Sequence, residues 1–98
     1  MNKKWHKHAA DMEQYQKLMT KANGLYKQGK YDEALEAYKR FLEFIERTFD
    51  PSPPKRAREI AECLTIILGL YVKTGRDGSE ESDSYLLRFL KMGMPPES

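Results

Sequence analysis

Residues 25–38 read Leu25-Tyr26-Lys27-Gln28-Gly29-Lys30-Tyr31-Asp32-Glu33-Ala34-Leu35-Glu36-Ala37-Tyr38, and this stretch decides the fold. Apolar residues on both sides of Gly29 recur at steps of three and four, which is typical of one face of an α-helix. Gly29 follows the last periodic residue of the first pattern, where a helix often ends on a left-handed glycine. Because the second pattern starts within two residues, the stretch predicts two helices joined by a tight turn.

Outward from this turn, the periodicity predicts a first hairpin over residues 3–48. Its first helix runs from about Lys3 to Gln28 and its second from Tyr31 to about Thr48, and the second is amphipathic. A link this short makes the two helices antiparallel. The apolar stripe expected on the first helix comprises Trp5, Ala9, Met12, Tyr15, Met19, Ala22 and Tyr26.

A proline-containing linker, residues 49–54, precedes a second expected hairpin over residues 54–92. The third helix, from about Pro54 to Thr74, is apolar nearly all round and is therefore expected to be covered on several sides. Within it, Gly69 predicts the close approach of another helix or of a ligand, with helix packing preferred, because glycine is otherwise unfavourable there. Residues 75–79 read as a turn in which Ser79 or Asp77 caps a fourth helix, from about Glu80 to Met92.

Composition sets the broad class. A chain of 98 residues is expected to form one domain, and its 40% apolar and 33% charged residues are ordinary for a soluble globular protein. The formal charge of +2 gives little support for a nucleic-acid partner. No apolar run is long enough to span a membrane, and the start of the sequence lacks the apolar stretch of a secretory signal. We therefore expect a cytoplasmic location.

The phrase around Gly29 resembles the centre of a tetratricopeptide repeat, with its glycine at the turn followed by Tyr31, Ala34 and Tyr38. A similar phrase, Leu70-Tyr71-Val72-Lys73-Thr74-Gly75-Arg76, follows later in the chain. Its spacing from the first exceeds the usual repeat of about 34 residues, and residues 77–82 form an insertion. The resemblance implies an all-α, right-handed array of four helices, made of two antiparallel hairpins with a degenerate second repeat.

This resemblance also implies a function, namely a protein–protein interaction module acting as an adaptor, scaffold or chaperone-like protein. The first helix of each pair in that family lines a groove that binds a peptide or a partner helix. On this chain the corresponding partner-binding residues are Gln16, Met19, Asn23, Tyr26 and Lys27.

Two other interpretations stay open. The first half also resembles the MIT domains, three-helix trafficking modules that bind helical tails, although three helices would leave residues 80–92 unexplained. The fourth helix also carries more apolar surface than one neighbour covers, and its expected contact face comprises Leu86, Leu87, Leu90 and Met94. We expect this face to be covered by a second copy in a homodimer, by the first helix folding round, or by a partner protein.

Catalytic and metal-binding patterns are missing from the sequence. His6 and His8 are two residues apart, whereas two ligands on one helical face need a spacing of three or four. Cys63 has apolar neighbours and reads as a core residue. With no nucleophile motif, paired carboxylates or phosphate loop, we expect no enzyme, cofactor or metal.

Two basic clusters remain, Lys3, Lys4 and Lys7 at the start and Lys55, Arg56 and Arg58 at the opening of the third helix. Positive charge at a helix N-terminus is disfavoured by the helix dipole, so the second cluster indicates an acidic partner surface. The alternative is simple pairing with Glu59 and Glu62 within one helical turn.

Overall fold

The computed structural model describes the backbone of residues 3–50 and 53–93 and the side chains of residues 9–50 and 53–92. Every regular element in this part of the chain is an α-helix: α1 (Lys3–Lys27), α2 (Tyr31–Thr48), α3 (Pro54–Lys73) and α4 (Glu80–Gly93). The predicted all-α class and the four predicted helices are therefore confirmed, with bounds within one residue of those expected.

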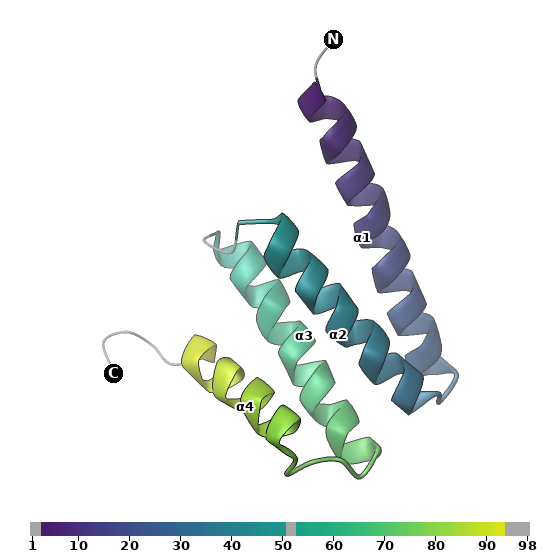
Figure 1. Cartoon of the computed structure of the whole chain (residues 1–98), viewed down its shortest axis with the longest axis vertical. Coiled ribbons are helices and arrows are strands. Elements are labelled where there is room, and N and C mark those ends of the chain that lie inside the picture. The colour runs from purple at the N-terminus through teal and green to yellow at the C-terminus, as the bar shows by residue number, and fades with distance from the viewer. Residues whose placement is uncertain (1–2, 51–52, 94–98) are drawn as a thin grey trace.

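The four helices lie in a row. α1 packs on α2, α2 on α3, and α3 on α4, and the chain turns back at each connection (Figure 1). The radius of gyration, 14.9 Å, exceeds the value of about 13 Å for a compact domain of this length. Among the described residues α1 does not pack on α4, so the row is open and does not close into a bundle.

Two glycines end α1 and α3 in the same way. Gly29 and Gly75 have φ angles of 78° and 72°, in the left-handed region that favours glycine. At each, two backbone N–H groups donate back to the last turn: Gly29 to Tyr26 and Lys30 to Leu25 in one case, Gly75 to Val72 and Arg76 to Tyr71 in the other. These paired bonds are those of the Schellman motif, which satisfies the terminal carbonyl groups.

The starts of α3 and α4 follow from local chemistry. Pro54 stands at the first turn of α3, where its missing N–H costs nothing. Ser79 caps α4, since its Oγ accepts a hydrogen bond of 3.1 Å from the backbone N–H of Ser82. Ser79 is therefore the capping residue among the two predicted candidates.

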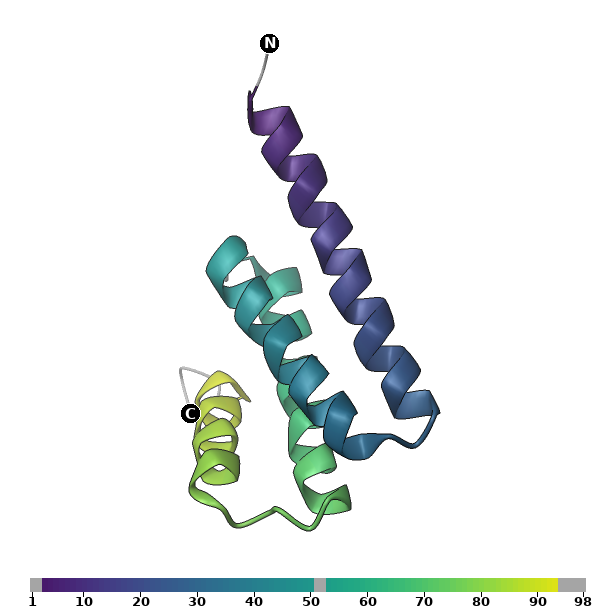
Figure 2. The same ribbon diagram turned by 45° about the vertical axis from the view of Figure 1, so that its right-hand side comes forward.

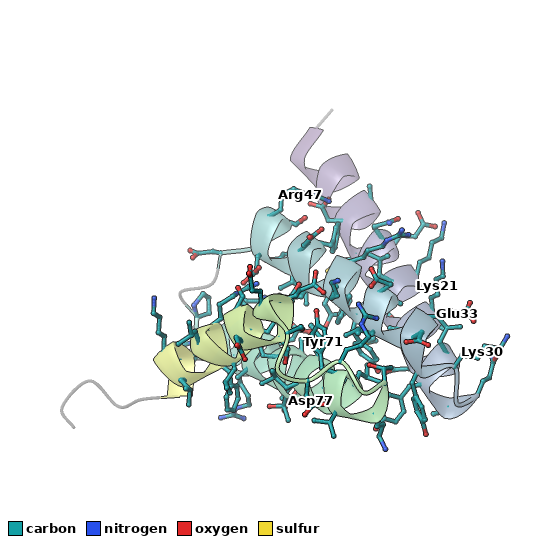
Figure 3. All side chains as sticks on the ribbon, turned by 60° about the horizontal axis from the view of Figure 1, so that its bottom comes forward. Lys21, Lys30, Glu33, Arg47, Tyr71 and Asp77 are labelled. Atoms are coloured by element: carbon teal, nitrogen blue, oxygen red, sulfur yellow. The ribbon has the colours of Figure 1, made fainter. Side chains whose placement is uncertain are left out.

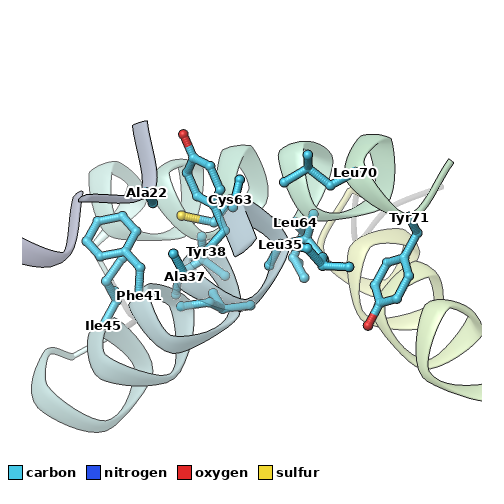
Figure 4. Packing of buried hydrophobic residues seen from close by; sticks show 14 residues of the cluster. Ala22, Leu35, Ala37, Tyr38, Phe41, Ile45, Cys63, Leu64, Leu70 and Tyr71 are labelled. Atoms are coloured by element: carbon cyan, nitrogen blue, oxygen red, sulfur yellow. The ribbon is translucent and has the colours of Figure 1, made fainter. Parts of the chain in front are cut away.

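The core lies between the two inner helices (Figure 4). α2 contributes its whole apolar face and α3 contributes the side that faces α2, whereas Ala22 is the single buried apolar residue among the described side chains of α1, residues 9–27. α4 adds only the half-buried rings of Tyr85 and Phe89. The largest fully enclosed side chains of the core are Tyr71, Leu35, Leu42, Ile45, Leu64, Ile67 and Leu70.

The first helix is less buried than its apolar stripe predicts. The N-terminal part of α1 extends beyond the end of α2, so it has no neighbour there (Figure 2). Ala9 and Met12 are exposed, and Tyr15 and Met19 are half-buried. The side chain of Trp5 lies outside the described residues. A helix with one neighbour can bury only the part of its stripe that this neighbour covers.

The third helix is covered on two sides, by α2 and α4, but not all round. Val72 is 63% exposed, and Gly69 has no atom within 4 Å of the position where a Cβ would stand. The prediction that Gly69 permits close approach of another helix is therefore wrong. The face of α3 that carries Gly69 points away from both neighbouring helices.

A cluster of ion pairs joins the start of α4 to α2 and to the end of α3. Lys39 Nζ lies 3.0 Å from Glu81 and 3.3 Å from Glu36, and Arg76 lies within 4.0 Å of Asp32, Glu36 and Glu81. The buried Tyr71 hydroxyl also donates a hydrogen bond to Glu81. Hydrogen bonds from Tyr71 and Lys39 lower the pKa of Glu81.

No described helix is both long enough and apolar enough to cross a membrane.

Candidate functional site

A groove separates α1 from α3 along one face of the row. Within the described residues no Cα atom of α1 lies within 8 Å of a Cα atom of α3, although both helices pack on α2. Packed helices have interaxial distances of about 8–10 Å, which bring many Cα atoms that close. α1 and α3 are therefore the walls of a groove whose floor is α2.

Two adjoining hollows make up this α1–α3 groove. The wider one, about 390 Å³, opens toward the N-terminal ends of α1 and α3, and the narrower one, about 140 Å³, lies nearer the α1–α2 turn. Glu59 and Glu62 line both, so the two hollows lie next to each other. The residues that define the groove are Met12, Tyr15, Met19, Asn23, Tyr38, Phe41, Lys55, Arg56, Arg58, Glu59, Glu62, Cys63 and Ile66.

Aromatic contacts position side chains at the wider end, whose lining is Met12, Tyr15 and five charged residues of α3. The ring of Tyr15 packs edge-on against Phe41 and Phe49, with centroids 5.2 Å and 6.1 Å apart. The guanidinium of Arg56 stands 4.3 Å from the centroid of Phe49 and also pairs with Glu59. These contacts hold Arg56 in place, so this end of the groove has an ordered wall.

The narrower end presents a polar group beside apolar ones. The hydroxyl of Tyr38 donates a hydrogen bond to Asn23 Oδ1, which orients the amide. The amide nitrogen of Asn23 bonds to no other described residue, and Asn23 is exposed. An amide nitrogen carries two donors. Asn23 can therefore donate to a carbonyl or carboxylate oxygen in the groove.

Burial changes the titration of two groups in the groove. Burial raises the pKa of Cys63 to about 12, with nearby carboxylates adding to the effect. The thiol is therefore protonated at neutral pH and is a poor nucleophile. Partial burial, with Glu62 nearby, also raises the pKa of Glu59 even though Arg56 pairs with it.

The basic residues at the start of α3 were predicted either to face an acidic partner or to pair with nearby glutamates, and the structure shows that they do not all behave alike. Arg56 pairs with Glu59, as the local-pairing alternative expected. Lys55 and Arg58 are exposed, and neither pairs with a described carboxylate. Two free cations therefore stand at the wider end of the groove. The side chains of Lys3, Lys4 and Lys7 lie outside the described residues.

The structure brings together two of the five predicted groove residues. Met19 and Asn23 line the narrower hollow with Ile66 and Cys63 of α3. Gln16 and Lys27 are exposed but line neither hollow. Tyr26, which is 36% exposed, packs edge-on against Tyr31 and Tyr38 and lines neither hollow.

Sequence reasoning did not assign Met12, Tyr15 and the carboxylates Glu59 and Glu62 to the groove. Met12 and Tyr15 belong to the stripe that was expected to be buried. Their incomplete burial depends on the angle between α1 and α3, which helical periodicity does not report. One signal was present, since the basic residues of α3 suggested a surface for a partner.

A second surface lies on α4. Leu86, Leu87 and Leu90 are 43%, 59% and 47% exposed, and we call them the α4 apolar face. Met94, which was predicted to belong to this face, lies outside the described residues. α1 does not fold over the α4 apolar face, because among the described residues it packs on α2 alone. Of the three predicted ways to cover the α4 apolar face, a second copy and a partner protein therefore stay open.

Among the described residues, no group of three histidine, cysteine or carboxylate side chains could hold a metal ion. The side chains of His6 and His8 lie outside those residues.

Comparison of the chain with protein-family models, with curated proteins and with solved structures finds no match.

Proposed function

We propose that this protein is an interaction module that binds a peptide segment or a helix of another protein in the α1–α3 groove. The observation that carries the proposal is the separation of α1 from α3, which leaves apolar side chains open to solvent between two ordered walls. Grooves of this kind accept an extended or helical peptide through alternate side chains.

The residues of the groove describe the segment that would fit. Met12, Met19 and Ile66 offer apolar contacts along the groove. Lys55 and Arg58 favour a carboxylate at the wider end, and Asn23 favours an oxygen acceptor at the narrower end. The best-matched segment therefore carries apolar side chains and an acidic group at the end that meets the start of α3.

The tetratricopeptide-like arrangement, a right-handed array of two antiparallel hairpins, is part of the proposal. It is supported by the identical helix ends at Gly29 and Gly75, which are the glycines of the two similar sequence phrases. In such an array α1 and α3 are the groove-lining helices. An MIT-like three-helix module is the alternative proposal, but it has no counterpart for α4.

An adaptor, a scaffold subunit and a chaperone-like protein all use a groove of this chemistry, and a cytoplasmic location suits each of them. Catalysis is not part of the proposal, because the cysteine in the groove is protonated and buried.

The proposal is tested by immobilising the chain and selecting the peptides that bind it from a phage-displayed library of random dodecapeptides. We expect enriched peptides to share apolar residues followed or preceded by Asp or Glu at one end. Met12→Glu and Ile66→Glu, tested separately, should each weaken the enriched peptide by about tenfold or more, because a carboxylate would face the peptide's apolar side chains.

Val72→Glu is the matched control, since it places the same charge on a residue that is 63% exposed and lines neither hollow of the groove. Each variant is first compared with the native chain by circular dichroism and thermal melting. Absence of any enriched motif, or equal binding of the peptide to the native chain and both groove variants, would refute the proposal.

A further inference from the structure

The outer side of the first hairpin carries an unfilled hollow that the proposed peptide groove does not use. This α1–α2 notch has a volume of about 360 Å³ and is lined by Leu18, Lys21, Leu25, Asp32, Glu33, Glu36, Ala37 and Arg40. Leu18 and Leu25 are half-buried in it. None of its residues belongs to α3, so it opens on the side of α1 and α2 away from the α1–α3 groove.

Charge in the notch is ordered along α2. Asp32 and Glu33 stand at the end of the notch near the Gly29 turn, and Arg40 stands about two helical turns further along α2. Lys21 of α1 lines the same notch. At 1.5 Å per residue, Glu33 and Arg40 are separated by roughly 10 Å along the helix axis. Lys21, Glu33 and Arg40 form no ion pair with a described residue. Figure 3 shows Lys21 and Glu33 on the same outer edge of the molecule.

α4 carries the same order of charge on its exposed side, acidic nearer its N-terminus and basic nearer its C-terminus. Asp83, Leu87 and Lys91 follow one another at intervals of four, so they share one helical face with Leu90. Asp83 and Lys91 are separated by roughly 12 Å along the axis. Both are exposed and neither pairs with a described residue.

The two patterns match when α4 runs opposite to α2. Asp83 then faces Lys21 and Arg40, and Lys91 faces Asp32 and Glu33. The exposed leucines between the two charges then meet the notch, whose apolar lining comprises Leu18, Leu25 and Ala37. The spacings of roughly 12 Å and 10 Å agree within one residue, which is the match that an interhelical interface requires.

We infer that α4 of one copy docks in the α1–α2 notch of a second copy. The notch lies on α1 and α2 and the α4 apolar face lies on α4, so the interface joins two different surfaces, is heterologous, and leaves one free surface of each kind. Copies therefore add head to tail, while the α1–α3 groove of every copy stays open.

Sedimentation velocity and light scattering over a range of concentrations test this assembly. The native chain should show a mass that rises with concentration through dimer to larger species. Lys21→Glu with Arg40→Glu disables the notch, and Leu87→Glu with Leu90→Glu disables the α4 apolar face. Each double variant alone should be monomeric at concentrations where the native chain assembles, with self-association weakened by about tenfold or more.

Mixing the two double variants provides the sharpest test. The first keeps a native α4 and the second keeps a native notch, so the mixture should form a dimer of one copy of each and nothing larger. Adding Asp83→Lys to the notch variant should restore self-assembly, because the charges are then exchanged between the two surfaces. This rescue separates the interface from any loss of folding.

Three results would overturn the inference. A native chain that is monomeric at high micromolar concentration has no such interface. Assembly that survives either double variant uses other surfaces. Monomers that persist in the mixture, with each variant natively folded by circular dichroism, show that the two surfaces do not meet.

Discussion

The two hairpins end their first helices with the same motif but distribute burial in opposite ways. In the first hairpin, the second helix α2 carries the core, and over residues 9–27 α1 buries only Ala22 among its apolar residues. In the second hairpin, the first helix α3 carries the core and α4 buries no apolar residue completely. Position in the row, and not position in the repeated phrase, therefore decides which helix is buried.

The largest expected effect separates an inner helix from an outer one. Leu64→Ala in α3 removes a fully enclosed side chain and should cost about 2–5 kcal/mol of unfolding free energy. Leu87→Ala in α4 removes an exposed side chain and should change stability by about 0.5 kcal/mol or less. Urea denaturation below the concentration of self-association measures both, and comparable losses would contradict the assignment of the core.

The shared turns give the next effect. Gly29→Ala and Gly75→Ala should each cost about 1–2 kcal/mol, because alanine is strained at the observed positive φ angles. Gly69→Ala is the matched control, since Gly69 is helical and open to solvent, and it should stabilise the fold by about 0.5–1 kcal/mol. Thermal melts of the three variants compare them directly. A loss of stability in Gly69→Ala would show that another helix does approach there.

Each hairpin also has one tyrosine hydroxyl that joins its helices, and the two acceptors differ in charge. Tyr71→Phe removes a bond to the carboxylate of Glu81 and should cost about 1–2 kcal/mol. Tyr38→Phe removes a bond to the neutral amide of Asn23 and should cost about 1 kcal/mol or less. Chemical denaturation of both variants measures the difference, and a larger loss for Tyr38→Phe would reverse our comparison.

The smallest effect is the pH dependence of the charge cluster in the second hairpin. The folded pKa of Glu81 lies below its ordinary value of 4.5, so the stability it contributes is present above pH 4.5 and is lost as pH falls through the lowered pKa. Glu81→Gln should therefore make stability less dependent on pH below 4.5. Because Glu81 is exposed, we expect a difference of about 1 kcal/mol or less.

Unfolding free energies of the native chain and Glu81→Gln, measured between about pH 3 and 6, check this prediction. Glu80→Gln is the control, because Glu80 occupies the same first turn without an ion pair to a described residue. If both variants follow the native pH profile, Glu81 does not fasten α4 in the way described.

Much of the fold could be predicted from the sequence, because helix bounds depend on local signals. Gly29, Pro54 and Ser79 mark ends and starts through backbone chemistry that needs no tertiary information. The burial of α1 and the environment of Gly69 could not be predicted in this way. Both depend on how many neighbours a helix has, and periodicity shows where the apolar residues lie without showing what covers them.

The candidate groove was predicted in part for the same reason. Met19 and Asn23 were predicted from the face of α1 that lines the groove in tetratricopeptide repeats, and both line the narrower hollow here. Glu59, Glu62 and Arg56 join them from α3, more than thirty residues away in sequence. Which residues of α3 oppose α1 depends on the angle at which each helix crosses α2.

Binding in the α1–α3 groove is tested most directly by methyl NMR of the chain labelled at methionine and isoleucine, titrated with the peptide enriched by selection. Met12, Met19 and Ile66 report on the groove, whereas Met92 on α4 and the buried Ile45 report on the rest of the molecule. We predict that the peptide shifts the three groove methyl signals and leaves Met92 and Ile45 unchanged. Shifts at Met92 without shifts at Met12, Met19 and Ile66 would contradict the account.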